Sequence, residues 1–266
     1  MLALKTPYKT RSEMKKIIGL VAVGLLTFTN PATSNTNIPK QRANNIVLVH
    51  SALVDGSSWR GVYEILRRDG FKVSVVAHTQ INLEDDVKAT KLILDQQNGP
   101  TILVGASYGG TVITEAGNHD NVLALVYVAA MQPDFGETLV SLSKKIPPLS
   151  DSLKPNKEGF LTISPVRFHA EFGAELSEAD ADFLANAQMP LSVKAATTPA
   201  RIASWHNKPA YGIVALRDRL IDPKLQQFMY SRGHDKIFEV DASHAVFMTQ
   251  PKRVAEIIEQ AANESL

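Results

Sequence analysis

The sequence predicts an α/β fold in which a mostly parallel sheet carries helices on both faces. Short runs of apolar, mostly β-branched residues recur along the chain, and amphipathic segments of helical length separate them. Most of these runs are continuously apolar rather than alternating, which is typical of strands buried on both faces of a parallel sheet. The 266 residues are also enough to form one large hydrophobic core.

The predicted elements alternate from residue 44 onward. Strands are expected at 44–50, 71–76, 101–106, 122–129, 211–216 and 236–240. Helices are expected at 56–70, 83–97, 108–117, 222–231 and 251–263. The first helix has apolar residues at helical spacing and ends at Gly70, a helix-stop signal. The second helix is acidic at its start, as the helix dipole favours.

This alternation stops between residues 131 and 205. The segment contains many prolines and short helical pieces such as 177–187, and no strand is predicted within it. The sheet pattern resumes at residue 211. We therefore interpret 131–205 as a helical cap inserted into a domain that spans 45–266.

The first 34 residues have the pattern of a secretory signal peptide. Lys15 and Lys16 precede an uncharged, mostly apolar run at 17–28, which is shorter than the about 20 residues of a membrane span. Ala32 and Ser34 occupy the −3 and −1 positions of a cleavage site. We predict a signal peptide at 1–34 that starts at residue 1 or 14, a polar tether at 35–44, and a secreted or periplasmic protein without stable membrane insertion. An uncleaved anchor helix is the alternative.

Composition limits the chemistry of the protein. A formal net charge of +1 at pH 7 offers no electrostatic case for nucleic-acid binding. Cysteine is absent, which excludes disulfides, thiol chemistry and cysteine metal sites. The seven histidines show no metal-ligand spacing. We predict no metal and no cofactor, and the oligomeric state is not encoded in any pattern found.

A serine lies between glycines at the end of the third predicted strand, in the sequence TILVGASYGG. In Gly105-x-Ser107-x-Gly109 the serine is at a strand-to-helix turn. Such a strained turn exposes a nucleophile beside a helix N-terminus that stabilises an oxyanion, and flanking glycines avoid collisions with neighbouring backbone. A tight turn with an ordinary serine is the alternative. A dinucleotide-binding loop does not fit, because its GxGxxG motif needs glycine at the position of Ser107. A phosphate-binding P-loop does not fit either, because no GK[ST] sequence is present.

A serine nucleophile needs a base and an acid, which follow it along the chain in this arrangement. His244, the last histidine, comes after the final predicted strand and is the predicted base. Asp218 and Asp222 are candidates for the acid. Asp218 is favoured because it follows a strand end, whereas Asp222 precedes a proline and a helix, as an N-cap does. Asp241 lies only three residues before the histidine and is a poor orienter.

Two backbone amides are predicted to form an oxyanion hole. Tyr108, directly after the serine, supplies one, and Ala52, in the loop after the first strand, supplies the other. Ser51 is predicted to contact the substrate; a small side chain that merely points into the loop is the alternative. His50 is interpreted as a structural residue that packs this loop.

The chain from residue 45 onward resembles the α/β-hydrolase superfamily, and in particular small bacterial serine hydrolases similar to the plant methyl esterase and hydroxynitrile lyase group. The matching segments are VLVHSALVDGSSW, LVGASYGG, LVYVAAMQPDFGE, LRDRLIDP and DASHAVFMTQP. The resemblance implies that Ser107, Asp218 and His244 occupy the positions of a catalytic triad. It likewise implies that the two amides named above occupy the oxyanion positions.

Two residues depart from the family pattern. Esterases of this group usually have glycine where this chain has Ser51, whereas the lyases have a hydroxyl residue there. The lyases also place a lysine directly after the catalytic histidine to hold cyanide, and this chain has Ala245. The resemblance therefore implies a secreted serine hydrolase that cleaves a small carboxylic ester through an acyl-enzyme. A non-turnover ligand sensor on the same fold is the alternative, and hydroxynitrile lyase activity is less favoured.

Overall fold

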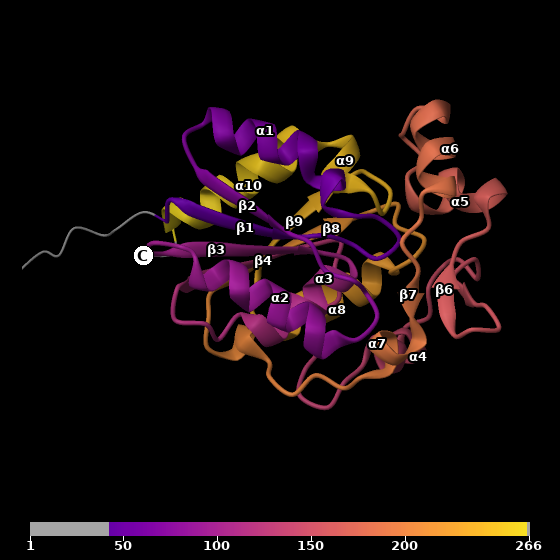
Figure 1. Ribbon diagram of the computed structural model, residues 1–266, viewed down its shortest axis with the longest axis horizontal. Helices are drawn as coiled ribbons and strands as arrows, with labels where there is room; N and C mark the ends of the chain where they lie inside the picture. Colours follow the sequence, from indigo (N-terminus) through magenta and orange to yellow (C-terminus); the bar gives the residue numbers. More distant parts are fainter. Residues whose placement is uncertain (1–42, 265–266) are drawn as a thin grey trace, which may run out of the picture. The chain divides into compact units, whose positions relative to one another are not determined.

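A six-stranded parallel sheet forms the centre of the computed structural model, which describes residues 43–264 (Figure 1). The sheet order is β2-β1-β3-β4-β8-β9, and every neighbouring pair is parallel. The strands are β1 Asn45–Val49, β2 Lys72–Val76, β3 Thr101–Ala106, β4 Val122–Val128, β8 Ala210–Ala215 and β9 Lys236–Val240. All six predicted strands are present, with ends that agree to one residue. The predicted signal peptide and nearly all of the tether lie outside the described residues.

Helices cover both faces of this sheet, which confirms the predicted fold class (Figure 1). One face carries α1 Arg60–Arg68 and α10 Pro251–Glu264. The other carries α2 Leu83–Asp95, α3 Tyr108–Ala116 and α8 Pro223–Arg232. The first predicted helix begins as the 3-10 turn η1 Gly56–Trp59, and a short helix after β9, α9 Val246–Thr249, was not predicted.

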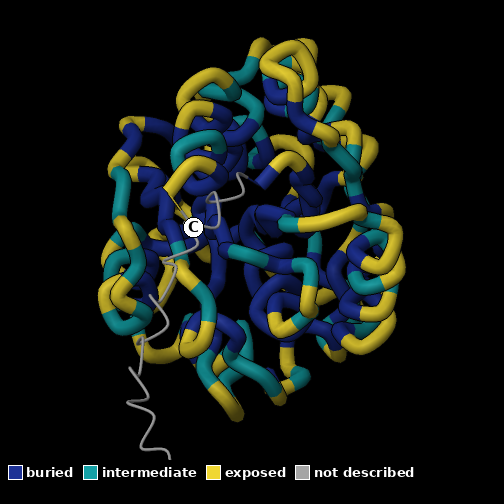
Figure 2. Tube along the Cα trace, turned by 90° about the vertical axis from the view of Figure 1, so that its left-hand side faces the viewer, coloured by how far each residue is buried: buried dark blue, intermediate teal, exposed yellow. Residues whose placement is uncertain are grey.

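The inner strands are buried on both faces, as their continuous apolar sequences predict. Every residue of β1 and β3 is buried, whereas the edge strands β2 and β9 are partly exposed. Buried residues run through the interior of the fold and exposed residues lie mostly at its periphery (Figure 2). The helix ends also follow the predicted signals. Gly70 ends the first helix with a φ of +92°, and Asn82 caps α2, whose first turn is acidic. Local sequence chemistry therefore sets the element boundaries.

The segment between β4 and β8 forms the cap, which lies at the carboxyl end of the strands (Figure 1). Its helices are α4 Leu139–Lys145, α5 Pro165–Phe172, α6 Glu178–Asn186, α7 Val193–Thr197 and the 3-10 turn η2 Ser204–His206. The prediction of no strand here is wrong, because β5 Lys154–Pro155, β6 Phe160–Thr162 and β7 Leu191–Ser192 form a small antiparallel sheet. Strands of two or three residues are too short to show a two-residue periodicity.

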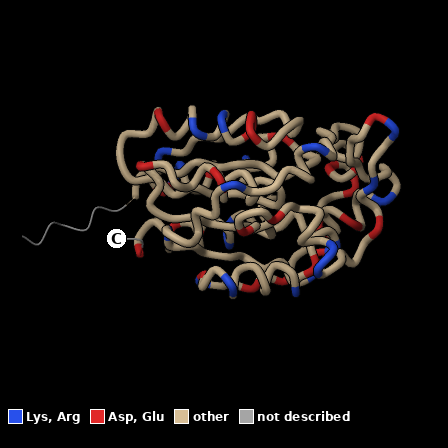
Figure 3. Tube along the Cα trace, turned by 90° about the horizontal axis from the view of Figure 1, so that it is seen from below, with Lys and Arg blue, Asp and Glu red and all other residues tan. Residues whose placement is uncertain are grey.

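Charged side chains of both signs are interspersed over the surface helices and the cap (Figure 3). Within residues 43–264, no helix has the length and apolar character needed to span a lipid bilayer. The parallel strands bring the loops that follow them to one edge of the sheet, beneath the cap, and that edge carries the predicted site residues.

Candidate active site

Ser107 occupies a sharp turn between β3 and α3. Its φ of 52° and ψ of −119° are unusual for a residue with a side chain and store backbone strain. A Cβ atom on Gly105 would lie 2.5 Å from the Gly109 carbonyl oxygen, and one on Gly109 would lie 2.6 Å from the Val49 carbonyl oxygen. The turn therefore requires glycine at both positions, for the steric reason predicted from the sequence.

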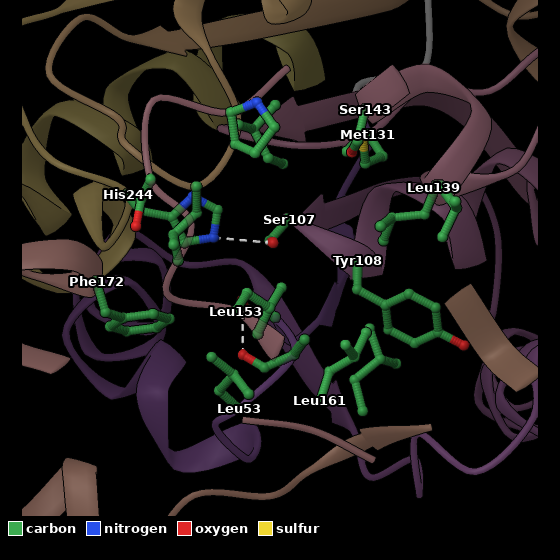
Figure 4. Close-up of a pocket in the computed structure, with 18 of the residues that line it drawn as sticks. Leu53, Ser107, Tyr108, Met131, Leu139, Ser143, Leu153, Leu161, Phe172 and His244 are labelled. Carbon is green, nitrogen blue, oxygen red and sulfur yellow. Dashed lines mark hydrogen bonds between the residues drawn. The ribbon is translucent and has the colours of Figure 1, made fainter. Parts of the chain in front are cut away.

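Three side chains from different loops form a continuous hydrogen-bonded chain at this turn. The His244 Nε2 atom lies 2.9 Å from the Ser107 Oγ atom (Figure 4). The His244 Nδ1 atom lies 2.7 Å from the Asp218 Oδ2 atom. All three residues are buried. They follow β3, β9 and β8, so the parallel sheet brings their loops to the same edge.

The Asp218 carboxylate is fixed by further hydrogen bonds. Its Oδ1 atom accepts from the backbone N–H groups of Leu220 at 2.8 Å and Ile221 at 3.0 Å. Its Oδ2 atom accepts from the Gln226 side-chain amide at 2.8 Å. Gln226, on α8, was not predicted from the sequence, because no motif marks a glutamine eight residues after an aspartate. These donors stabilise the ionised carboxylate and hold it toward the imidazole.

The other two aspartates lie elsewhere. Asp222 caps α8 by accepting from the Lys224 N–H at 2.7 Å, as the following proline indicates. Asp241 is largely exposed, and its carboxylate lies 2.8 Å from Arg217. Of the three aspartates considered, only Asp218 contacts His244 within the described part of the chain.

The two residues whose backbone amides are predicted to form an oxyanion hole border the same cavity as Ser107. One amide belongs to Tyr108, at the N-terminus of α3, and the other to Ala52, in the loop after β1. Neither N–H donates a hydrogen bond to an acceptor among residues 43–264. Both donors are therefore available to an oxygen atom bound beside the serine.

Ser51 also borders the cavity, but its hydroxyl is already engaged. The Oγ atom donates to the Ala52 carbonyl at 2.9 Å, and the residue is fully buried. Donation from this hydroxyl to a substrate atom would require the Ala52 bond to break, whereas its oxygen is still able to accept a hydrogen bond. Substrate contact by Ser51 stays a prediction.

A buried polar cluster supports the loops that carry the two amides. The His50 and His78 rings stack with their centres 3.6 Å apart, and His78 Nε2 donates to the His50 carbonyl at 3.2 Å. The Tyr108 hydroxyl donates to Asp86 at 2.8 Å, and the His78 Nδ1 atom lies 3.6 Å from the same carboxylate. His78 and Asp86 were not predicted, because their partners are distant in the sequence. The cluster links the loop after β1 to the turn at the serine.

Burial and neighbouring groups together set the pKa values of His50 and Asp86 in this cluster. Desolvation, together with the neighbouring His78, lowers the pKa of His50 to about 4, so the imidazole is neutral at pH 7. Burial acts to raise the pKa of Asp86, but the nearby His78 ring and hydrogen bonds from Tyr108 and Gln80 outweigh burial and hold that pKa below its usual value. His50 is therefore a neutral, buried imidazole that stacks on the His78 ring, in line with its interpretation as a residue that packs this loop.

The cavity beside Ser107 and His244 has a volume of about 240 Å³ (Figure 4). Most of its lining is apolar, with side chains from both the sheet domain and the cap. The cap contributes Leu139, Val140, Leu153, Leu161, Phe172 and Leu191. The cap also contributes the polar residues Ser143, Lys144 and Ser150, so the cavity suits a mainly apolar molecule with a few polar groups.

A family model described as the alpha/beta hydrolase family matches residues 46–257. The chain belongs to this family. Two curated relatives are esterases or hydrolases. A pyrethroid hydrolase of Sphingobium wenxiniae is 26% identical over 243 residues, which cover 80% of this chain and 86% of that protein. A carbendazim hydrolyzing esterase of Nocardioides sp. is 31% identical over 119 residues, which cover 39% of this chain and 49% of the esterase.

Solved structures of other hydrolases share the fold of this family member. A pyrethroid hydrolase from Sphingobium faniae superposes with a TM-score of 0.71 at 23% identity. The match covers 84% of this chain and 98% of that hydrolase. Polyneuridine aldehyde esterase superposes with a TM-score of 0.72 at 16% identity. The match covers 83% of this chain and 100% of that esterase. The family match confirms the resemblance to α/β hydrolases inferred from the sequence motifs, and polyneuridine aldehyde esterase shares the fold.

We predict that His50 makes the free energy of unfolding depend on pH between about 6.5 and 4. The unfolded chain takes up a proton on His50 in this window and the folded protein does not, so stability falls as the pH falls. The loss should reach about 3 kcal/mol, at most about 1.4 kcal/mol per pH unit. Urea denaturation of the wild type and His50→Asn at several pH values measures it.

In His50→Asn, the free energy of unfolding should lose the pH dependence that His50 contributes between about pH 6.5 and 4. His234→Asn is the matched control, because this histidine is exposed and asparagine tolerates its φ of 56°. Equal pH dependence in the wild type and His50→Asn would contradict the assignment of a buried neutral imidazole.

Proposed function

We propose that this α/β hydrolase is a serine hydrolase that cleaves a small carboxylic ester through an acyl-enzyme. The observation that carries the proposal is the chain of hydrogen bonds from Ser107 through His244 to Asp218 at a strained turn. A hydroxyl is a weak nucleophile unless an adjacent base takes its proton, and the imidazole is in position to do so. The esterase and hydrolase relatives support hydrolysis of an ester.

In the proposed reaction, the Ser107 Oγ atom attacks the acyl carbon while His244 Nε2 accepts the hydroxyl proton. Asp218, bonded to Nδ1, holds the tautomer and stabilises the charged imidazolium. The amides of Tyr108 and Ala52 bind the oxyanion of the tetrahedral intermediate. Losing one such donor raises a barrier by about 3–4 kcal/mol. The imidazolium then protonates the departing alcohol, and water activated by the same histidine releases the acid.

The cavity indicates the kind of ester. Most of its lining surface is apolar and leucine is the commonest lining residue, so an apolar acyl or alcohol group would be desolvated favourably. A volume of about 240 Å³ fits a small molecule rather than a polymer. Two relatives are a pyrethroid hydrolase and a carbendazim hydrolyzing esterase, which supports a small-molecule substrate. Ser51 is proposed to shape the wall beside the oxyanion amides.

We also propose that the protein is exported. The support is the sequence itself, in which Lys15 and Lys16 precede the apolar run at 17–28 and a small-residue cleavage site ends at Ser34. Export would place the hydrolase in contact with substrates from outside the cell.

Covalent labelling tests the nucleophile. A fluorophosphonate probe should label the protein once, at Ser107, because among residues 43–264 this hydroxyl alone contacts a histidine base. His244→Ala should reduce the labelling rate by several orders of magnitude, since the serine then keeps its proton. Mass spectrometry of the labelled peptides identifies the site. Labelling of Ser107→Ala to the wild-type extent would disprove the proposed nucleophile.

The two aspartates provide a matched pair. Asp218→Asn should lower kcat by about 10⁴-fold, because the amide favours the wrong histidine tautomer. Asp222→Asn should leave kcat nearly unchanged, because asparagine also caps helices. Steady-state kinetics on a short-chain aryl ester, with circular dichroism to verify folding, measure both. The reverse ranking would show that Asp218 is not the orienting acid.

Export is tested in a Gram-negative host. The full-length protein should appear in the periplasm with Asn35 as its first residue, because cleavage follows Ser34. N-terminal sequencing and cell fractionation check both points. Replacing Lys15 and Lys16 with glutamate should retain the protein in the cytoplasm, and a full-mass cytoplasmic product from the wild type would count against export.

A further inference from the structure

Both chain neighbours of His244 are hydrogen bonded to the cap. The Ser243 N–H donates to the Glu175 carboxylate at 3.1 Å, and the Ser243 hydroxyl donates to the same carboxylate. On the other side, the Ala245 N–H donates to the Phe172 carbonyl at 2.9 Å. Phe172 ends α5, and Glu175 lies in the loop between α5 and α6. The backbone that carries the imidazole is therefore attached to the cap before and after it.

Both chain neighbours of Asp218 contact the same cap segment. The Arg217 guanidinium lies 2.8 Å from the Glu175 carboxylate, and the Arg219 Nε atom donates to Glu171 at 2.8 Å. The Glu171 side chain is only 6% exposed. Burial acts to raise its pKa, but Arg219 and Arg167 outweigh burial and hold the pKa below its usual value, so this carboxylate stays charged.

One side chain joins the two loops. The Glu175 carboxylate accepts hydrogen bonds from Ser243, in the loop after β9, and pairs with Arg217, in the loop after β8. Its side chain is 26% exposed, so the ion pair is partly desolvated. The Phe172 ring lies 5.5 Å from the His244 ring at an interplanar angle of 64°, an edge contact that limits ring rotation.

We propose that cap segment 171–175 positions the His244–Asp218 pair and that Glu175 is the positioning residue that links their loops. The inference rests on the proposed function, and it gives the cap a second role beyond lining the cavity. The loops after β8 and β9 lack regular structure at these residues, so contacts with the cap restrict their movement. A misplacement of about 1 Å lowers catalysis by about 100-fold, so a cap that is not docked leaves the base out of place.

Glu175→Ala tests this role on an acetate ester too small to fill the part of the cavity lined by the cap. The variant should lower kcat by about 10- to 100-fold with little change in KM, since the loss is in the placement of the base. The rate of fluorophosphonate labelling of Ser107 should fall by the same factor. The melting temperature should change little, because Glu175 lies in a partly exposed loop. Glu175→Gln, which keeps an accepting oxygen, should be intermediate.

Glu158→Ala is the matched control. Glu158 lies in the turn between β5 and β6 of the same cap, and its side chain has no hydrogen bond or ion pair among the described residues. This variant should keep wild-type kinetics. A double variant of Glu175→Ala with Ser243→Ala should lose little more kcat than Glu175→Ala alone. The hydrogen bond that Ser243→Ala removes, from the Ser243 hydroxyl to Glu175, is already absent in Glu175→Ala.

The outcomes separate the two proposals. A wild-type protein that is not labelled at Ser107 overturns the proposed function and this inference with it. A labelled wild type whose Glu175→Ala variant keeps the wild-type kcat and labelling rate overturns the positioning role alone. A rise in KM without a fall in kcat also overturns it, because the segment would then act only on substrate binding. If Glu175→Ala does not fold, Glu175→Gln decides in the same way, because it removes the charge that pairs with Arg217.

Discussion

The close contact between the turn at Ser107 and the end of β1 is the constraint on which the site depends. Gly109 approaches the Val49 carbonyl so closely that no side chain fits between them. The turn is also fixed from β4, because the Ser107 N–H donates to the Val128 carbonyl at 3.2 Å. A strained residue of this kind costs about 1–3 kcal/mol and persists only where the surrounding structure determines it. Two buried neighbouring strands provide that support and aim the hydroxyl out of the sheet.

Electrostatics beneath this turn follow from the same packing. The carboxylate of Asp86 is buried, yet it bonds Tyr108 and two backbone amides, at Thr79 and Gln80. A buried charge is tolerated only when it is well bonded, and this one holds the residue next to the serine through its side chain. The stacked His50 and His78 rings fill the space between this carboxylate and the loop after β1. The loops that carry the backbone amides beside the serine are thus supported by His50, His78 and Asp86, which are buried and do not line the cavity.

The cap also positions residues of the site, through its contacts with the loop that carries His244. Phe172 borders the cavity, its ring contacts His244, and its carbonyl accepts from Ala245. A single residue therefore links the apolar wall to the imidazole. Water exclusion by such a wall strengthens the hydrogen bonds between the imidazole and its partners, because their interaction is less screened. The shape of the cavity and the placement of the histidine consequently depend on the same docking of the cap.

The sequence by itself determined the strands, the covering helices, and the position of the serine, aspartate and histidine after their strands. These features are local, since apolar runs, caps and glycine spacing act within a few residues, and parallel strands share one carboxyl edge. Asp222 could be assigned to a helix cap because proline follows it. Only the tertiary structure decided that Gln226, His78, Asp86 and Glu175 join the site, and that three short strands form in the cap. Their partners are distant in the chain, so the interactions exist only after the fold brings the elements together.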